Sequence, residues 1–257
     1  MTDEQTTDAR NDSGSTDRTT TGPEAATKRK RTDISVILDR SGSMRARKQQ
    51  AIDSFNDFLA EQRGVEGKAK ISLVRFDHEY EPVFSGLALT DAPDLDERSY
   101  QPRGMTALLD AIGRTVAATE ARLARRAERR KARGKAVKAP DVIVVVITDG
   151  LENASSEYDH ADIKAHIARL EQEHEWTFLF MGTSEASVTE AERFGVHKDR
   201  AFAMGETPEA YARAQHVVGG KVRTVREMNA DAAMSLKRQA LAFTEEEREA
   251  ARQRDRS

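Results

Sequence analysis

The sequence predicts an α/β fold: a doubly wound, mainly parallel, Rossmann-like sheet with helices on both faces. Short runs that are apolar at nearly every position, such as 34–38 and 142–147, are typical of central parallel strands covered on both sides. These runs alternate with stretches of ten or more residues whose apolar positions recur at helical spacing. One further run contains Pro82 and Gly86, so we expect one antiparallel strand at the border of the sheet.

The first half of the predicted fold consists of a strand, a helix, a second strand and an edge strand, in that order. Residues 33–38 form the first strand, and residues 45–62 form a helix that Gly64 ends. The second strand covers 69–76. Residues 80–89 form the edge strand, because a proline in that run cannot donate a hydrogen bond to a neighbouring strand.

The second half repeats the alternation. A helix begins at Thr106 and runs into a basic segment, 122–138. Residues 141–150 are the most apolar run in the chain, and its short length and β-branched composition predict a central strand. The remaining predicted elements are a helix over 159–173, a strand over 176–182, a helix over 184–194 and a short strand over 201–204.

The chain divides into four predicted parts. They are a disordered N-terminal tail (1–31), the α/β domain (32–205), a C-terminal helical extension (206–243) and a flexible tail (244–257). The first part has almost nothing to bury, so ordering it would cost entropy without hydrophobic return. The extension is expected to contain helices over 208–218 and 221–242. Their apolar stripe favours packing within the chain, and the alternative is a last covering helix plus a docking arm for oligomerisation or for a partner.

Composition excludes several classes of function. The 41 basic and 44 acidic residues nearly cancel, so no global field would recruit nucleic acid or an anionic membrane. The absence of cysteine excludes disulfides, thiolate metal sites and cysteine nucleophiles. We see no signal-peptide core and no run long enough to cross a bilayer, so we expect a soluble, cytoplasmic protein.

The basic segment 122–138 contains nine basic residues and one acidic residue. A solvated helix end and loop is the simplest interpretation of such a run. The alternative is a docking surface for phosphate or for an acidic protein.

Oxygen-bearing side chains gather at the predicted carboxyl ends of two central strands. Asp39 ends the first strand and Asp149 ends the 141–150 strand, and open α/β sheets place their sites at this rim. Thr106 opens the intervening helix and can reach the same point, where Ser41 and Ser43 add two more hydroxyls. The set contains neither imidazole nor sulfur, so it suits a hard divalent cation: Mg²⁺ above all, with Mn²⁺ or Ca²⁺ as competitors.

Three motifs, "DISVILDRSGSM", "GMTALLDAIG" and "VVVITDG", resemble in order and spacing the von Willebrand factor A (VWA) domain with its metal-ion-dependent adhesion site, or MIDAS. The resemblance covers about residues 32–205, and "TDGLENAS" also resembles bacterial members of the family. Intracellular bacterial members of this kind work alongside ATPases, metal-insertion machines or stress systems, and others are phage-encoded. Met44 and Arg45 stand where a second acidic cluster would be needed for an adjacent cation. We therefore predict one metal ion.

The resemblance also implies roles for the five residues. Ser41 and Ser43 would bind the cation directly, and Thr106 directly or through water. Asp39 and Asp149 would often act through water. One coordination position would remain free for a Glu or Asp of a partner protein.

The leading prediction is a non-enzymatic, cation-dependent protein interaction module with no catalytic residue. The alternative is a non-ATPase subunit of an ATP-driven complex, of the AAA+ or chelatase-like kind. A magnesium-dependent phosphohydrolase is weaker, because it needs a carboxylate two residues after Asp39, where Ser41 stands. A serine hydrolase needs a histidine base, and the six histidines fall in polar, surface-type stretches.

Overall fold

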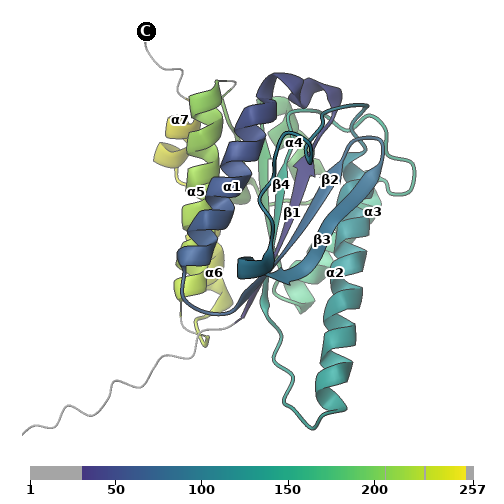
Figure 1. The fold of residues 1–257 in the computed structure, drawn as a ribbon, viewed down its shortest axis with the longest axis vertical. Helices are drawn as coiled ribbons and strands as arrows, with labels where there is room; N and C mark the ends of the chain where they lie inside the picture. The colour runs from purple at the N-terminus through teal and green to yellow at the C-terminus, as the bar shows by residue number, and fades with distance from the viewer. Residues whose placement is uncertain (1–30, 206, 229, 253–257) are drawn as a thin grey trace, which may run out of the picture.

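The structure, a computed structural model, describes residues 31–205, 207–228 and 230–252 (Figure 1). The predicted disordered tail, apart from Arg31, lies outside the described residues, as do residues 253–257 of the predicted flexible tail. None of the helices in the described ranges is both long and apolar enough to cross a membrane.

A six-stranded sheet forms the centre of the molecule and confirms the predicted fold class. Its strands are β1 (Thr32–Asp39), β2 (Ala69–Phe76), β3 (Tyr80–Ala88), β4 (Asp141–Ile147), β5 (Thr177–Gly182) and β6 (Ala201–Ala203), in the order β3-β2-β1-β4-β5-β6. All neighbours pair in parallel except β2 and β3. The antiparallel edge strand is therefore where the proline predicted it, and its register shifts between Ile71 and Val74.

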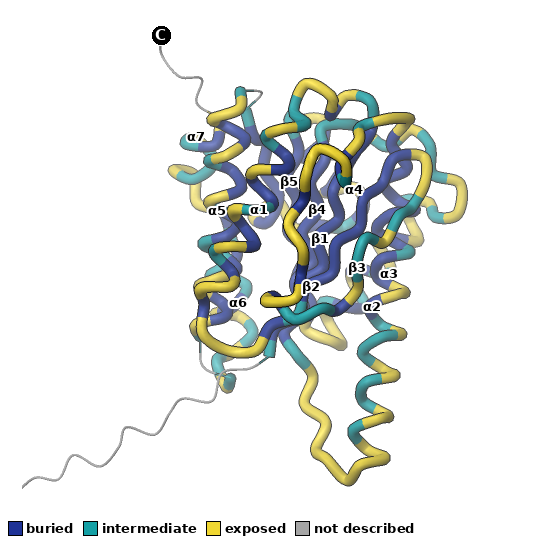
Figure 2. The backbone as a smooth tube through the Cα atoms, viewed as in Figure 1, coloured by how far each residue is buried: buried dark blue, intermediate teal, exposed yellow. Residues whose placement is uncertain are grey.

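Helices cover both faces of this sheet (Figure 1). They are α1 (Lys48–Gly64), α2 (Leu108–Lys131), α3 (His160–Glu173), α4 (Glu185–Arg193), α5 (Pro208–Glu227), α6 (Met234–Leu241) and α7 (Glu245–Arg252). One core contains Phe55 of α1 and Val218 of α5, and the other contains Ile112 of α2 and Ile163 of α3. The central strands are buried along their whole length, because both of their faces lie under helices (Figure 2).

Helix α5 corrects the predicted break at Gly219 and Gly220, because it continues through both residues. Gln62 of α1 donates a hydrogen bond from Nε2 to the carbonyl oxygen of Gly219 at 3.0 Å. A Cβ on Gly219 would lie 2.1 Å from Oε2 of Glu61, so the missing side chain leaves room for this glutamate. The glycine marks close approach of two helices rather than a helix end.

The predicted helix over 221–242 is wrong in its middle. The chain leaves α5 after Glu227 and begins α6 at Met234. Lys237 of α6 is buried and its Nζ lies 3.0 Å from both carboxylate oxygens of Asp141, at the start of β4. A long-range ion pair therefore fixes α6 to the amino end of the sheet.

The predicted flexible tail is also corrected, because residues 245–252 form α7. Thr244 and Glu247 make a reciprocal cap: Glu247 N donates to Thr244 Oγ1 at 3.2 Å, and Thr244 N donates to Glu247 Oε2 at 2.8 Å. Ala251 is fully buried, and its carbonyl oxygen accepts from the amide of Gly205 at 2.8 Å. The C-terminal helices thus pack onto the α/β domain instead of projecting from it.

Candidate metal centre

Four of the five predicted site residues lie in one hydrogen-bonded row at the carboxyl ends of β1 and β4. The backbone amide of Ser41 donates to Oδ1 of Asp39 at 2.6 Å. The hydroxyl oxygens of Ser41 and Ser43 are 2.9 Å apart, and Ser43 donates to Oδ1 of Asp149 at 2.5 Å. The first and last members of the row, Asp39 and Asp149, are separated by 110 positions in the sequence.

Thr106, the fifth residue, lies beside this row. Its side chain is buried, and a Cβ built on Gly150 would lie 2.8 Å from its Oγ1. The threonine hydroxyl therefore faces the backbone next to Asp149. The side chain and amide of Asn153 hold the Thr106 backbone, accepting from its amide at 2.8 Å and donating to its carbonyl at 3.0 Å.

Backbone hydrogen bonds join the loop of the two serines to the loop that carries Thr106. Gly42 N donates to Gly104 O at 3.1 Å, and Arg103 N donates to Arg40 O at 2.7 Å. Gly104 has a φ of +72°, and a Cβ there would lie 2.2 Å from Nδ1 of His78, so this turn requires glycine.

Glu152 holds the loop after β4 in place beside the site, a role that the sequence did not reveal. Its carboxylate accepts from the amide of Leu109, in the first turn of α2, at 2.9 Å. It also accepts from the amides of Ala154 and Ser155. A negative group at the start of a helix satisfies amides that have no intrahelical partner. Glu152 thus ties the loop after β4 to the helix that begins beside Thr106.

Burial disfavours the ionised form of both carboxyl groups. Burial raises the pKa of Asp39 to about 6, although hydrogen bonds from Thr148 and Ser41 lower it in part and the charge of Asp149 raises it further. Burial likewise raises the pKa of Asp149, against a hydrogen bond from Ser43 and the charge of Arg47. Positive charge arriving at this point would relieve both effects.

Three neighbours of the carboxylates were not predicted from the sequence. Thr148 donates from Oγ1 to Oδ2 of Asp39 at 2.5 Å, and Nη1 of Arg47 lies 3.1 Å from Oδ2 of Asp149. Tyr100 is fully buried and donates to the carbonyl oxygen of Asp39 at 2.5 Å. Thr148 could have been found, because it is a hydroxyl residue at the same strand end as Asp149. Arg47 and Tyr100 carry no comparable signal.

A buried ion-pair cluster supports the serine loop from the other side. Asp77 is fully buried, and its Oδ2 lies 3.0 Å from Nε of Arg40 and 3.0 Å from Nε of Arg103. Arg40 also contacts Glu81 on β3. Arg40 is therefore anchored to the residue after β2, to β3 and, through Asp77, to the loop before α2.

The donor set fits a hard divalent cation. Neighbouring oxygens around an octahedral Mg²⁺ at about 2.1 Å are about 3 Å apart, which is close to the 2.9 Å between the two serine hydroxyls. Within the described ranges, no group of three or more His, Cys, Asp or Glu side chains could hold a metal ion. The candidate centre has only two carboxylates and depends on alcohols for the rest of its ligands.

Comparison with known proteins finds one similar domain family. Residues 34–152 match the family model described as von Willebrand factor type A domain. A search of curated protein sequences found no match.

Among solved structures, the vWF domain of the type V pili tip protein Mfa5 from Porphyromonas gingivalis is similar, with a TM-score of 0.53 and 13% identity over 79% of this chain and 98% of that one. A von Willebrand factor type A protein from Catenulispora acidiphila gives a TM-score of 0.49 and 15% identity over 76% of this chain and 43% of that one. Proximal thread matrix protein 1 from the mussel byssus gives a TM-score of 0.47 and 12% identity over 74% of this chain and 45% of that one. The chain thus spans less than half the length of these last two proteins.

At 13% identity the match with the Mfa5 domain indicates a shared fold and nothing more. The match with the Mfa5 domain agrees with the six-stranded mixed sheet and its flanking helices. The segment 34–152 is thus similar to the von Willebrand factor type A domain, and the fold agrees with that similarity.

Proposed function

We propose that this protein is a cation-dependent protein interaction module without catalytic activity of its own. Asp39, Ser41, Ser43, Thr106 and Asp149 would hold one Mg²⁺, or Mn²⁺ or Ca²⁺ in its place. When bound, the cation supplies a positive centre that can accept a Glu or Asp carboxylate of a partner protein.

The observation that carries the proposal is the row of oxygens at the strand ends. Ser43 Oγ lies 2.5 Å from one carboxylate and 2.9 Å from the other serine hydroxyl. Two carboxyl groups with raised pKa values lie in the same cluster. Such a cluster is favoured where the protein must receive a cation, since charge that is costly to keep buried alone is stabilised by the ion.

The rim of the site supports binding to a protein. Met105 and Leu151 are 57% and 47% exposed, and they flank Thr106 and Asp149 in sequence. Large apolar side chains exposed beside a charged centre favour a partner that carries an apolar residue next to its carboxylate.

Association with an ATP-driven complex is a special case of this proposal, in which the partner is an ATPase. The same experiment tests both. Hydrolase chemistry receives less support, because Ser41, two residues after Asp39, bonds to Ser43 and offers no acid. His160 contacts Glu190 of α4 rather than a serine.

Affinity capture from a cytoplasmic extract of the source organism tests the proposal. The bait is the full chain in Mg²⁺ or in EDTA, beside the variants Ser41→Ala/Ser43→Ala and Ser85→Ala, the last an exposed serine on β3. We expect a partner that the chain and Ser85→Ala retain only in Mg²⁺, and that is lost when one of its own acidic residues is changed to the amide. A partner retained equally in EDTA would contradict the proposal, as would hydrolysis of p-nitrophenyl phosphate that Asp39→Asn abolishes.

A further inference from the structure

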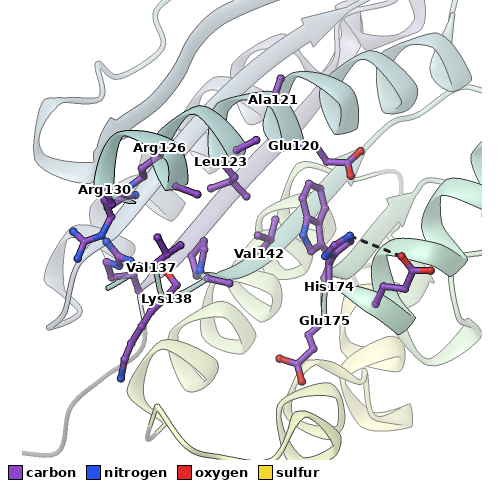
Figure 3. Close-up of a pocket in the computed structure, with 17 residues that line it drawn as sticks. Glu120, Ala121, Leu123, Arg126, Arg130, Val137, Lys138, Val142, His174 and Glu175 are labelled. Atoms are coloured by element: carbon purple, nitrogen blue, oxygen red, sulfur yellow. Dashed lines mark hydrogen bonds and ion pairs between the residues drawn. The ribbon is translucent and has the colours of Figure 1, made fainter. Parts of the chain in front are cut away.

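A groove of about 730 Å³ lies at the opposite end of the sheet from the candidate metal centre (Figure 3). Arg31, Pro140 and Trp176 line it, and they immediately precede β1, β4 and β5. The eight residues of β1 separate the two ends by roughly 25 Å. The groove and the metal centre are therefore separate places on the molecule.

The floor of the groove is apolar. It is made by Leu123 of α2, Val137 of the following loop, Val142 of β4 and the indole of Trp176. Val137 is 42% exposed, one of the few large apolar side chains of the described residues that face solvent. Helix α2 projects beyond the amino ends of the strands (Figure 1). Its residues between Glu120 and Arg130 line one side of the groove.

Unbalanced positive charge lines one end of the groove. Arg126, Arg130 and Lys138 lie together there, with Val142 between them and the opposite end (Figure 3). Arg126 has no hydrogen bond or ion pair to any described residue. Burial and then the charges of Arg126 and Arg130 lower the pKa of Arg31, as burial and then Arg126 lower that of Lys70. These cations repel one another.

The other end is acidic: Glu120, Glu173 and Glu175 line it, and Glu120 already has a cationic partner. Glu120 accepts from Arg169 of α3 at 2.9 Å through both of its oxygens. Glu173 lies 4.0 Å from Nε2 of His174. Cations that repel one another therefore lie at the basic end of the groove, where anionic groups of a ligand would relieve the repulsion.

We infer that this groove binds an acidic peptide segment of a partner protein, with its carboxylates at Arg126 and Arg130 and apolar side chains over Val142 and Trp176. Charge complementarity selects this occupant. The three residues before Arg31 are Lys28, Arg29 and Lys30, so the flanking sequence of the chain itself would add like charge. The basic segment 122–138 is therefore more than a solvated helix end.

Trp176 is the single tryptophan of the chain and reports on the groove directly. The probe is a peptide with three glutamates followed by Leu, Phe and Leu, compared with the same peptide carrying glutamines. Titration of the full chain is carried out in EDTA, so that the metal centre takes no part. We expect saturable change in tryptophan emission with the acidic peptide, and at least tenfold weaker binding of the glutamine peptide.

Variants separate a specific groove from a generally basic surface. Arg126→Glu/Arg130→Glu should weaken binding at least tenfold, and Arg126→Gln about threefold. Arg125→Glu/Arg129→Glu is the matched control, because these arginines lie on the same helix, are exposed and do not line the groove. It should change binding less than threefold in 150 mM salt. Thermal melting of each variant checks its folding, and Arg126→Gln breaks no described contact.

Three results would overturn the inference. The first is no binding of the acidic peptide at millimolar concentration, and the second is equal loss of affinity in the groove variant and its control. The third is self-association of the full chain, measured by sedimentation, that Arg126→Glu abolishes while the peptide fails to bind. That result would assign the groove to a second copy of the chain.

Discussion

Replacing Asp39 by asparagine is expected to stabilise the metal-free protein and to remove its response to Mg²⁺. The carboxyl of Asp39 is fully buried and its pKa is raised to about 6, against an ordinary value of about 3.9. This difference corresponds to about 3 kcal/mol, by which the ionised carboxylate destabilises the folded state. Asparagine can keep the local bonds, accepting from Ser41 N and donating to Thr148, whose hydroxyl can rotate toward Gly150 O.

The sign of the pH dependence follows from proton binding. Between about pH 4 and pH 6 the folded state of the wild type holds more protons at Asp39 than the unfolded state does, so this group lowers stability as pH rises. The variant lacks this group. The excess stability of Asp39→Asn should therefore be near zero at pH 4, grow to about 3 kcal/mol by pH 7 and stay constant above.

Urea unfolding in EDTA at several pH values measures the difference in free energy of unfolding between Asp39→Asn and the wild type. Groups that titrate in the same way in both proteins do not affect this difference. In Mg²⁺ at a hundred times its dissociation constant the wild type should gain about 2.7 kcal/mol and the variant little. Asp110→Asn is the control: that buried carboxylate accepts from the amides of Ser156, Glu157 and Tyr158, so its loss should destabilise. An Asp39→Asn protein less stable than wild type in EDTA at pH 8 would show that the buried charge of Asp39 does not destabilise the folded state.

Three further predictions concern contacts outside the row of ligands. Lys237→Ala should cost about 3–5 kcal/mol in urea unfolding, because it leaves the buried Asp141 carboxylate without its ammonium partner; a loss below 1 kcal/mol would show that α6 is not fixed by this pair. Thr244→Ala removes the cap of α7 and should lower the free energy of unfolding by about 1 kcal/mol, whereas no change in melting temperature would indicate that α7 contributes nothing to stability. Arg47→Gln should tighten Mg²⁺ binding several-fold in calorimetry, since the guanidinium competes with a cation for Asp149, and unchanged affinity would exclude that competition.

The parts of this fold that follow a local rule could be predicted from the sequence. Strand β4 is short, β-branched and apolar, and the proline of β3 allowed only an edge. The juxtaposition of Asp39 with Asp149 followed from the rule that parallel strands end at one rim. The metal-binding roles of these residues stay a prediction.

Parts that depend on distant partners could not be predicted. The glycines of α5 suggested a break, because nothing local indicates that the Glu61 side chain fills the space beside them. Helix α7 is so rich in charge that its pattern resembles a frayed tail, although its threonine and glutamate make a capping pair. The ion pair of Lys237 with Asp141 joins residues 96 positions apart. No periodicity in the sequence contains that information.

Whether the strand-end oxygens bind a cation is tested by calorimetric titration of the full chain with Mn²⁺. The wild type is compared with Ser41→Ala/Ser43→Ala and with Ser85→Ala. We expect one ion per chain in the wild type and in Ser85→Ala, and none in the double variant at the same concentrations. Equal binding by the double variant, or no binding by the wild type at millimolar Mn²⁺, would contradict it.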